Sequence, residues 1–516
     1  MASKTMISSI ALSTLIYSTF LFSSSQLLAQ TSKENQGYDL LISNVTVLSP
    51  ERDEPLSNAY VAIKGGRIVA IDDQSNTRDA SQVIDGTGKF LIPGLIDSHV
   101  HLYHATGLKK RYTKNFDSLY KNYMEQMPRS FLYHGFTTVI EAYADFETNQ
   151  RFINSDVHPD LEYCEALILS DGFMAMEFPK EQLLERAPNF LYDPSNNGFL
   201  PKDAKAKNHT PQATVRRIAE SGAKCVKLHY EEALWMQPEK RKFAQLGEAI
   251  VKNVVAQAHK NNLKVMLHAT SEEGYLFAIK TGVDIISHGP WDWEDNDYLS
   301  VEIPEAVQRA ATIASKKHIA IQPTISALQH TASLFKPELL GDDDLQHVIS
   351  QDYINYLSTD AQKQRDIFIE KFGPLVMRNR GAESIRPAMM NMLKRYKRLV
   401  GGMAINGAKL IFGSDTSSGG FGWGNPPGLN GYWELKDWID SGIGLSEIFK
   451  ASTLNNAQAF GLDKDIGSIE LGKKANLLIL KSNPLKTIEA YNDIDLVLIN
   501  GKAIERKQLS ATMKKE

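Results

Sequence analysis

This sequence of 516 residues has few cysteines, a small net charge and few long apolar runs. The two cysteines, Cys164 and Cys225, are too few for a fold that depends on a network of disulfides. Both lie in apolar runs typical of core strands, so we expect two buried free thiols rather than a bridge. The formal net charge of −4, from 57 basic and 61 acidic residues, gives no electrostatic basis for binding nucleic acid.

The N-terminal segment is the one long apolar run. Met6 to Phe22 carries no charge, follows Lys4, and precedes serines and Ala29, which is small enough for signal peptidase. We therefore predict a signal peptide over residues 1–30 and an exported protein, periplasmic or secreted, with an uncleaved anchor as the alternative. No later apolar stretch approaches the ~20 residues of a membrane-spanning helix, so we do not expect the mature chain to span a membrane.

Short β-rich runs occur at both ends of the remaining chain. They are Tyr38–Thr46, Asn58–Ile71 and Gln82–Ile92 near the start, and Ala475–Lys481 and Asp495–Lys502 near the end. This arrangement predicts a small β-sandwich domain built from both chain ends, over residues 31–92 and 465–516.

From Gly94 the pattern changes to apolar strands that alternate with helical stretches. Eight strands are expected to end near His101, Ile140, Leu169, Lys227, His268, His288, Thr324 and Asp415. Eight such units predict an α/β fold, a (β/α)8 TIM barrel over residues 93–464, inserted in the β domain.

Two long insertions interrupt the predicted barrel, at about 171–211 and 326–400. Loops of this length after strand ends often build the pocket of a barrel enzyme. The second insertion is expected to be helical, with a basic end that we interpret as a solvated helix face, or otherwise as a site for an acidic group of the substrate. Its basic residues are Arg378, Arg380, Arg386, Lys394, Arg395, Lys397 and Arg398.

Polar side chains stand at the ends of several of these apolar strands. His99 and His101 lie two residues apart at a strand end, so both imidazoles point to the same face. Further strands end at Lys227, His268, His288 and Asp415. The active sites of TIM barrels lie at this rim, and packing does not explain charged residues there. We therefore predict that these side chains form one site.

The ligand types in this set indicate a metal centre. Imidazole and carboxylate ligands suit Zn²⁺, Mn²⁺, Fe²⁺ or Ni²⁺. A lysine that is desolvated beside cations can lose its proton. The neutral amine of Lys227 could then react with carbon dioxide and form a carbamate that bridges two ions.

These motifs resemble the amidohydrolase superfamily, in the imidazolonepropionase-like branch that also contains metal-dependent Xaa-Pro and arginine-type dipeptidases. The matching segments are LIPGLIDSHVHL, HGFTTV, GAKCVKLH, LHA, SHG, QPT, GSDT, ASTLNNAQAFGL and GSIELGKKANLLIL. They extend over nearly the whole chain after the leader. Glu141 and the residues after it depart from the Arg-Asp-containing segment usual there, so no substrate contact is carried over from that position.

The resemblance implies a role for each residue of the set. His99 and His101, with Asp415, would bind the more buried ion. His268 and His288 would bind the second, and carbamylated Lys227 would bridge the two, together with a hydroxide. Asp415 would act as general base and then as general acid. The ions are expected to be zinc, with manganese, iron or nickel as alternatives.

The expected substrate is a small molecule with an amide bond, a dipeptide or an N-acyl amino acid. A cyclic amide, lactone or ester cleaved at the same centre is the alternative, and a metal-retaining binding protein without catalysis is the remote one. His229, Tyr230 and Tyr103 follow the metal motifs and are candidate substrate contacts. The resemblance also implies a homo-oligomer, since dimers are common among such enzymes.

Overall fold

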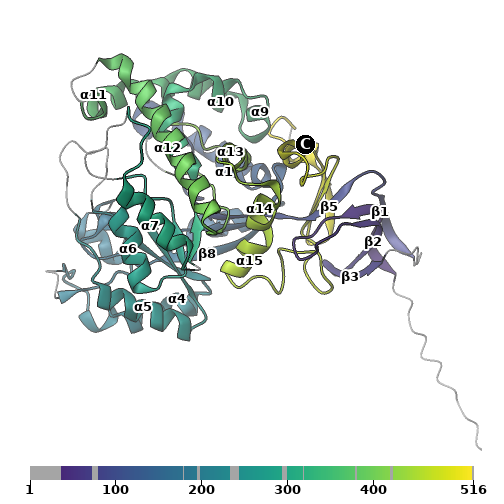
Figure 1. Ribbon diagram of the computed structural model, residues 1–516, viewed down its shortest axis with the longest axis horizontal. Helices are drawn as coiled ribbons and strands as arrows, with labels where there is room; N and C mark the ends of the chain where they lie inside the picture. The colour runs from purple at the N-terminus through teal and green to yellow at the C-terminus, as the bar shows by residue number, and fades with distance from the viewer. Residues whose placement is uncertain are drawn as a thin grey trace, which may run out of the picture. The chain divides into compact units, whose positions relative to one another are not determined.

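The computed structural model describes residues 37–72, 79–143, 145–177, 179–194, 198–232, 243–292, 299–317, 319–377, 381–418 and 422–513. The predicted signal peptide, 1–30, lies outside these ranges. Tyr38–Glu516 forms one compact unit with two sheets (Figure 1). No helix in the described part of the chain is both long and apolar enough to cross a membrane.

The larger sheet is a barrel of eight parallel strands whose spatial order follows the chain. Its strands are β6 (Leu95–Val100), β7 (Phe136–Glu141), β8 (Asp160–Ala166), β9 (Cys225–Tyr230), β10 (Lys264–Ala269), β11 (Ile285–Ser287), β12 (Ala320–Gln322) and β13 (Lys409–Leu410). The ring closes where the chain after β13 meets β6. There the Ser98 amide donates to the Phe412 carbonyl at 3.2 Å, and the Asp415 amide donates to the His99 carbonyl at 2.8 Å. The predicted (β/α)8 barrel is confirmed.

Helices surround the barrel strands and cover most of their outer faces, although the outward residues of β8 are only half-buried. They include α1 (Phe116–Tyr133), α2 (Phe146–Ile153), α4 (Pro211–Ser221), α5 (Glu248–Lys260), α6 (Glu272–Thr281), α7 (Glu305–Ser315), α13 (Leu429–Asp440), α14 (Leu445–Lys450) and α15 (Asn456–Ala459). Local sequence sets their ends. The Thr210 hydroxyl accepts from the Ala213 amide at the start of α4, and Gly222 takes the left-handed conformation at its end.

Both predicted insertions lie between barrel strands. The described residues between β8 and α4 include short helical turns, among them η2 (Phe173–Glu177) and α3 (Leu183–Arg186). The segment after β12 is helical, as expected, with α8 (Ile325–Ala332), α9 (Leu345–Val348), α10 (Gln351–Ser358), α11 (Lys363–Met377) and α12 (Ile385–Ile405). Figure 1 shows α9, α10 and α11 on the side of the barrel opposite α4 and α5.

The smaller sheet combines strands from both chain ends, in the order β16-β15-β14-β5-β1-β2-β3, with β4 paired to β1. Its strands are β1 (Tyr38–Val47), β2 (Leu56–Lys64), β3 (Arg67–Asp72), β4 (Ala80–Asp85), β5 (Phe90–Pro93), β14 (Leu477–Leu480), β15 (Ile494–Ile499) and β16 (Lys502–Glu505). Strand β5 joins the two halves, because it pairs with β1 and with β14. The sheet has its own apolar core, which includes Val45, Val61 and Ile479. The predicted domain boundaries stay a prediction.

The prediction of two free thiols is wrong. Cys164 on β8 lies opposite Cys225 on β9 with 4.5 Å between their Cα atoms, and the two form a disulfide. Both are buried in the apolar layer inside the barrel that includes Ile96 and Met266. Register partners in parallel strands point to the same face, which brings these two sulfur atoms together.

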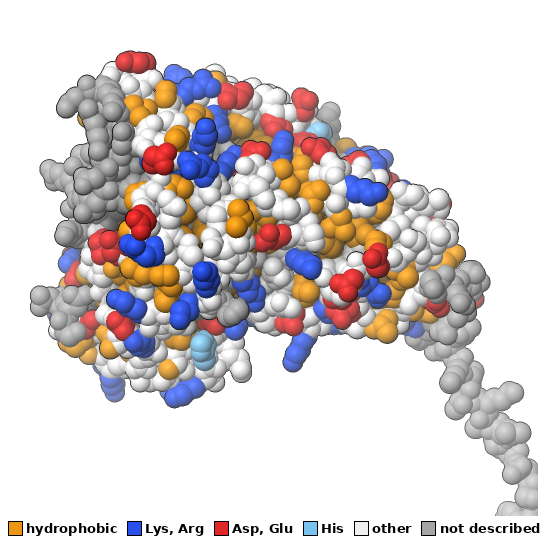
Figure 2. All heavy atoms as spheres, viewed as in Figure 1, with side chains coloured by type: hydrophobic (Ala, Val, Ile, Leu, Met, Phe, Trp, Pro, Cys, Tyr) orange, Lys and Arg blue, Asp and Glu red, His pale blue; other side chains and the backbone are white. Residues whose placement is uncertain are grey.

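The basic end of the second insertion is only partly a solvated face. Arg395 is buried, and the Lys397 ammonium lies 2.6 Å from the Asp437 carboxylate. Lys394 and Arg398 are exposed, as expected, while Arg378 and Arg380 lie outside the described residues. On the face shown in Figure 2, basic and acidic side chains are interspersed, which agrees with the balanced net charge.

Candidate metal centre

Two histidines and one carboxylate meet where the barrel closes. His99 and His101 come from the end of β6, and Asp415 follows β13. The Oδ1 atom of Asp415 lies 3.4 Å from Nε2 of His99 and 3.1 Å from Nε2 of His101. The candidate ligand atoms of the three residues all lie within 4.8 Å of one another. This donor set and spacing fit one divalent ion.

The other three predicted ligands lie beside this group. Nζ of Lys227 is 3.5 Å from Nε2 of His99. The ring centroids of His268 and His288 are 4.6 Å apart, and those of His288 and His99 are 5.2 Å apart. The structure therefore brings together all six residues predicted as metal ligands, from β6, β9, β10, β11 and the chain after β13.

Each of the four histidines has a polar partner on one ring nitrogen. The pairs are His99 Nδ1 with Gln322 Oε1 at 3.3 Å, His101 Nδ1 with Glu141 Oε1 at 3.6 Å, His268 Nε2 with Glu231 Oε2 at 2.9 Å, and His288 Nδ1 with Thr324 Oγ1 at 2.6 Å. The contacts of His99, His268 and His288 are hydrogen bonds, and the longer contact of His101 is an ion pair. Hydrogen-bonded partners of this kind fix the tautomer and orientation of metal-binding histidines. The second nitrogen of each ring is thus left for an ion, so the residues fit a metal centre.

These partners were not identified from the sequence. Glu141 ends β7, Gln322 ends β12, and Glu231 follows β9 by one residue. They stand at the same rim as the predicted ligands, so the rule that selected His, Lys and Asp at strand ends could have selected them too. Ser287, which ends β11, accepts a hydrogen bond from Nζ of Lys227 at 3.0 Å and donates to Gln322 at 3.0 Å.

Three residues at the rim have left-handed backbone conformations. The φ angles are 76° at His288, 48° at Thr324 and 55° at Asp415. Each such conformation costs about 1–3 kcal/mol in a non-glycine residue and persists only where the surroundings enforce it. Next to Thr324, the amides of Ile325 and Ser326 donate to the buried Glu434 carboxylate at 2.9 and 2.7 Å. Strain that clusters at one rim is typical of a functional site.

Burial dominates the electrostatics of the site. It lowers the pKa of Lys227 to about 7, although Asp415 and Glu141 act in the opposite direction. Burial also holds the pKa of His99 and of His288 well below its usual value, so both rings are neutral and able to bind an ion. For His101, burial is outweighed by the two carboxylates, which raise its pKa to about 9. A divalent cation would interact with the same two carboxylates in place of that proton.

The three candidate substrate contacts are placed differently. His229 points to the same face as Lys227, and its ring lies 5.5 Å from that of His268. The ring of Tyr103 lies 6.0 Å from that of His101. Tyr230 is not brought to the centre, because adjacent strand residues point to opposite faces. Its ring packs on Phe277 of α6 at 4.7 Å, and its hydroxyl donates to Glu232 at 3.0 Å.

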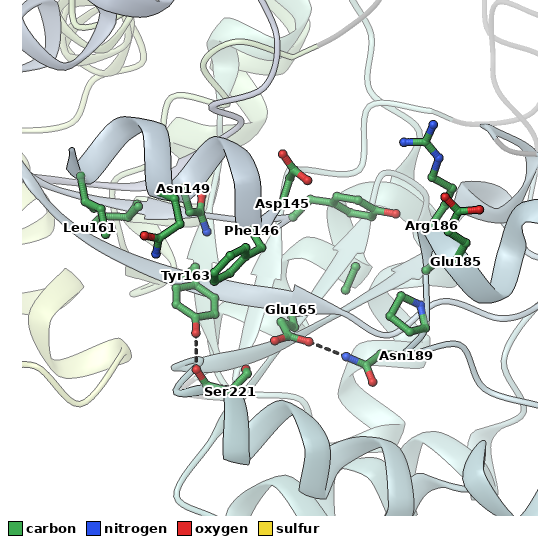
Figure 3. Close-up of a pocket in the computed structure, with 16 residues that line it drawn as sticks. Asp145, Phe146, Asn149, Leu161, Tyr163, Glu165, Glu185, Arg186, Asn189 and Ser221 are labelled. Atoms are coloured by element: carbon green, nitrogen blue, oxygen red, sulfur yellow. Dashed lines mark hydrogen bonds between the residues drawn. The ribbon is translucent and has the colours of Figure 1, made fainter. Parts of the chain in front are cut away.

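A cavity of about 590 Å³ lies away from these ligands, against the outer face of β8 (Figure 3). Leu161, Tyr163 and Glu165 of β8 line it, with Phe146 of the short helix α2. Glu165 accepts a hydrogen bond from Asn189 there. These three β8 residues lie on the outer face of the barrel, whereas Cys164 and the six candidate ligands lie on the inner face, so this cavity is separate from the metal centre.

Comparison with known proteins agrees with this geometry. An L-hydantoinase of Paenarthrobacter aurescens is 31% identical over 104 residues, which are 20% of this chain and 20% of that protein. An imidazolonepropionase of Staphylococcus aureus is 23% identical over 257 residues, 45% of this chain and 58% of that protein. The chain therefore matches less than two thirds of the length of these curated relatives.

Solved structures match nearly the full length. A Xaa-Pro dipeptidase with bound methionine superimposes with a TM-score of 0.59 at 20% identity, over 90% of this chain and 99% of that one. Ochratoxinase of A. niger gives a TM-score of 0.59 at 18% identity, over 90% and 95%. These matches show the fold. The profile of the amidohydrolase family matches residues 90–320 and 386–504, more than half of the sequence, and the chain therefore belongs to the amidohydrolase family.

Proposed function

We propose that this chain is an exported, metal-dependent hydrolase that cleaves a carbon–nitrogen amide bond of a dipeptide or an N-acyl amino acid. The observation that carries this proposal is the convergence of four histidines, one lysine and one aspartate at the barrel rim, each histidine with a partner on its other nitrogen. The dipeptidase among the structural neighbours supports the choice of substrate class.

The residues divide between two divalent ions, zinc or otherwise manganese, iron or nickel. His99, His101 and Asp415 would hold the first, and His268 and His288 the second. The lowered pKa of Lys227 supports a neutral amine, which could add carbon dioxide and release a proton; the resulting carbamate would help to hold both ions. Ions bound there lower the pKa of a coordinated water molecule and polarise a carbonyl oxygen.

The chain's own residues then handle the proton and the substrate. The Asp415 carboxylate accepts the proton released during attack and passes it to the leaving nitrogen, as general base and then general acid. His229 shares a face with Lys227, so it can donate a hydrogen bond to the substrate carbonyl. Glu231 accepts hydrogen bonds from His268 and from the Thr270 hydroxyl, which holds the His268 ring in one orientation.

Two observations support export. The predicted signal peptide is one, and the Cys164–Cys225 disulfide is the other, because disulfides persist mainly in oxidising compartments. A homo-oligomer stays an expectation, to be checked by light scattering of the purified protein.

The test is a mass-spectrometric screen of the zinc- or manganese-loaded mature protein against dipeptides, Xaa-Pro compounds and N-acyl amino acids. Cleavage of any subset, lost by orders of magnitude in Asp415→Asn with the fold intact, is the expected result. No cleavage with two ions bound per chain would instead indicate a cyclic amide, lactone or ester as substrate. Unchanged activity in Asp415→Asn would refute the proposed mechanism.

A further inference from the structure

A small pocket of about 140 Å³ adjoins the metal centre on the side of β6. It is lined by residues that directly follow two metal-ligand motifs, among them Tyr103, His104, Lys109 and Ser418. The Ser418 amide donates to the carbonyl of Asp415 at 2.8 Å, and the ring of Tyr103 lies 6.0 Å from that of His101. None of the six candidate ligands lines this pocket, but Tyr103 does, and its ring packs against that of His101. A molecule bound at the metal centre would therefore reach the pocket past the ring of Tyr103.

The charge in this pocket has one sign. Lys109 is half-buried in it, and no acidic side chain contributes to the lining. Within the described ranges, no carboxylate lies within ion-pair distance of the Lys109 ammonium. Burial, and to a lesser extent Arg111, lowers the pKa of Lys109. A half-buried cation without a counter-charge is costly, and a bound anion would offset that cost.

The loop that carries Lys109 is held in place by helix α10. The hydroxyl of Tyr353 donates to the Thr106 carbonyl at 2.7 Å, and that of Tyr356 donates to the Gly107 carbonyl at 3.0 Å. The Lys109 amide in turn donates to the Tyr356 hydroxyl at 3.3 Å. A ligand that binds here does not have to order the loop, which favours affinity.

His104 adds no positive charge to the pocket at neutral pH. Its burial, and the neighbouring His101 and Lys109, lower its pKa to about 3. The pocket thus offers the Lys109 ammonium, with aromatic and hydroxyl groups and the imidazoles of His104 and His330 around it. This composition suits a single carboxylate rather than a phosphate, for which several cationic or amide donors are usual.

We propose that Lys109 binds a carboxylate of the substrate while the scissile amide lies at the metal centre. This inference rests on the proposed function and narrows it to amides with a free carboxylate, such as N-acyl amino acids and dipeptides with an unblocked C-terminus. The carboxamides of the same compounds would lack the ion pair and bind more weakly.

The experiment compares each carboxylate substrate with its carboxamide in the metal-loaded protein, for the wild type, Lys109→Met and Lys109→Arg. For carboxylates we expect Lys109→Met to raise KM by about 10- to 100-fold with little change in kcat, since this is the size of one hydrogen-bonded charge contact. For carboxamides we expect no change, and Lys109→Arg should retain most of the affinity. Lys114→Met, at an exposed lysine in the same region, is the matched control.

Binding without turnover separates this inference from the proposed function. Isothermal titration of the same pairs with the wild type and Lys109→Met reports carboxylate recognition whether or not any bond is cleaved. A preference for carboxylates that depends on Lys109 supports the subsite, even if no amide is hydrolysed. Equal affinity for acids and carboxamides, or an unaffected Lys109→Met variant, would overturn it, even if amides are hydrolysed.

Discussion

The Oε2 atom of Glu231 lies 2.9 Å from Nε2 of His268 and accepts a second hydrogen bond, from the Thr270 hydroxyl, at 2.8 Å. A carboxylate in this position keeps a proton on Nε2 and leaves Nδ1 free to bind an ion. Glu231 itself is buried, so its orientation is fixed by these two contacts.

Replacement of this carboxylate by a neutral amide should therefore weaken metal binding. We expect Glu231→Gln to lower the affinity for the ion at His268 by about 10- to 100-fold, the usual effect of losing such a partner. Titration with a competing chelator, followed by metal analysis, measures this. Glu232→Gln, which changes the adjacent and more exposed carboxylate, is the control. Identical affinities in both variants would contradict the role given to Glu231.

Lys227→Ala should lose metal and activity together. No other side chain described at the rim occupies the place between His99 and Ser287 that Lys227 fills. Metal content per chain and turnover are the two measurements. Lys224→Ala is the matched control, because Lys224 precedes β9 and pairs with Glu162 at 3.6 Å on the surface. Near-normal metal content in Lys227→Ala would rule out the carbamate.

Loss of the disulfide should destabilise the barrel. Cys164 and Cys225 are 61 residues apart in sequence, and a cross-link over such a loop contributes roughly 4 kcal/mol through the entropy of the unfolded chain. We expect Cys164→Ser with Cys225→Ser, or reduction of the wild type, to lower the urea midpoint accordingly. Thiol titration of the unfolded, unreduced protein should detect no free thiol, and two free thiols would show that the bridge is absent.

Glu434 should make stability depend on pH. Burial, with Asp437 nearby, raises the pKa of this carboxyl to about 7, despite hydrogen bonds from Ser326, Trp438 and Ile325. The folded state therefore holds this proton more tightly than the unfolded state, whose value is 4.5. The protonated carboxyl therefore contributes its full stabilisation of the folded state below pH 4.5. As the pH rises from there to about 7, this contribution to the free energy of unfolding falls by about 1.4 kcal/mol per pH unit.

Unfolding by urea at several pH values between 5 and 7 tests this. The free energy of unfolding of Glu434→Gln should fall less steeply with pH than that of the wild type, because glutamine does not ionise. Parallel curves for the two proteins would mean that Glu434 is ionised in the folded protein throughout this range.

The predicted ligands were accessible from sequence because each combines a polar residue with a clear place at the end of an apolar strand. His99, Lys227 and His268 lie within their strands, and His101 and His288 follow β6 and β11 by one residue. Asp415 lies five residues after β13, yet the extended chain between them still carries it to the rim. The spatial order of the strands could also be predicted, because the strands of a (β/α)8 barrel lie side by side in the order of the chain.

The features that were not predicted correctly depend on the relative rotation and register of segments that are far apart in the sequence. The pairing of Cys164 with Cys225 needs the register of β8 on β9. The burial of Arg395 needs the rotation of α12 about its axis, which its mixed pattern does not define. Tyr230 was predicted as a substrate contact from its chemistry. The face of β9 on which it lies is instead set by the alternation of side chains along the strand. The contact between Glu231 and His268 joins the ends of the neighbouring strands β9 and β10, and the position of Glu231 alone does not show which histidine it contacts.

The amide of Asp415 is bonded to the carbonyl of His99, so one ion site is assembled from the first and the last strand of the barrel. A chain that has completed only part of the ring cannot offer this site. An ion held by His99, His101 and Asp415 would therefore find its complete ligand set only after the ring has closed. If the protein crosses a membrane unfolded, the ion at this site would come from the compartment in which the ring closes, not from the one in which the chain was synthesised.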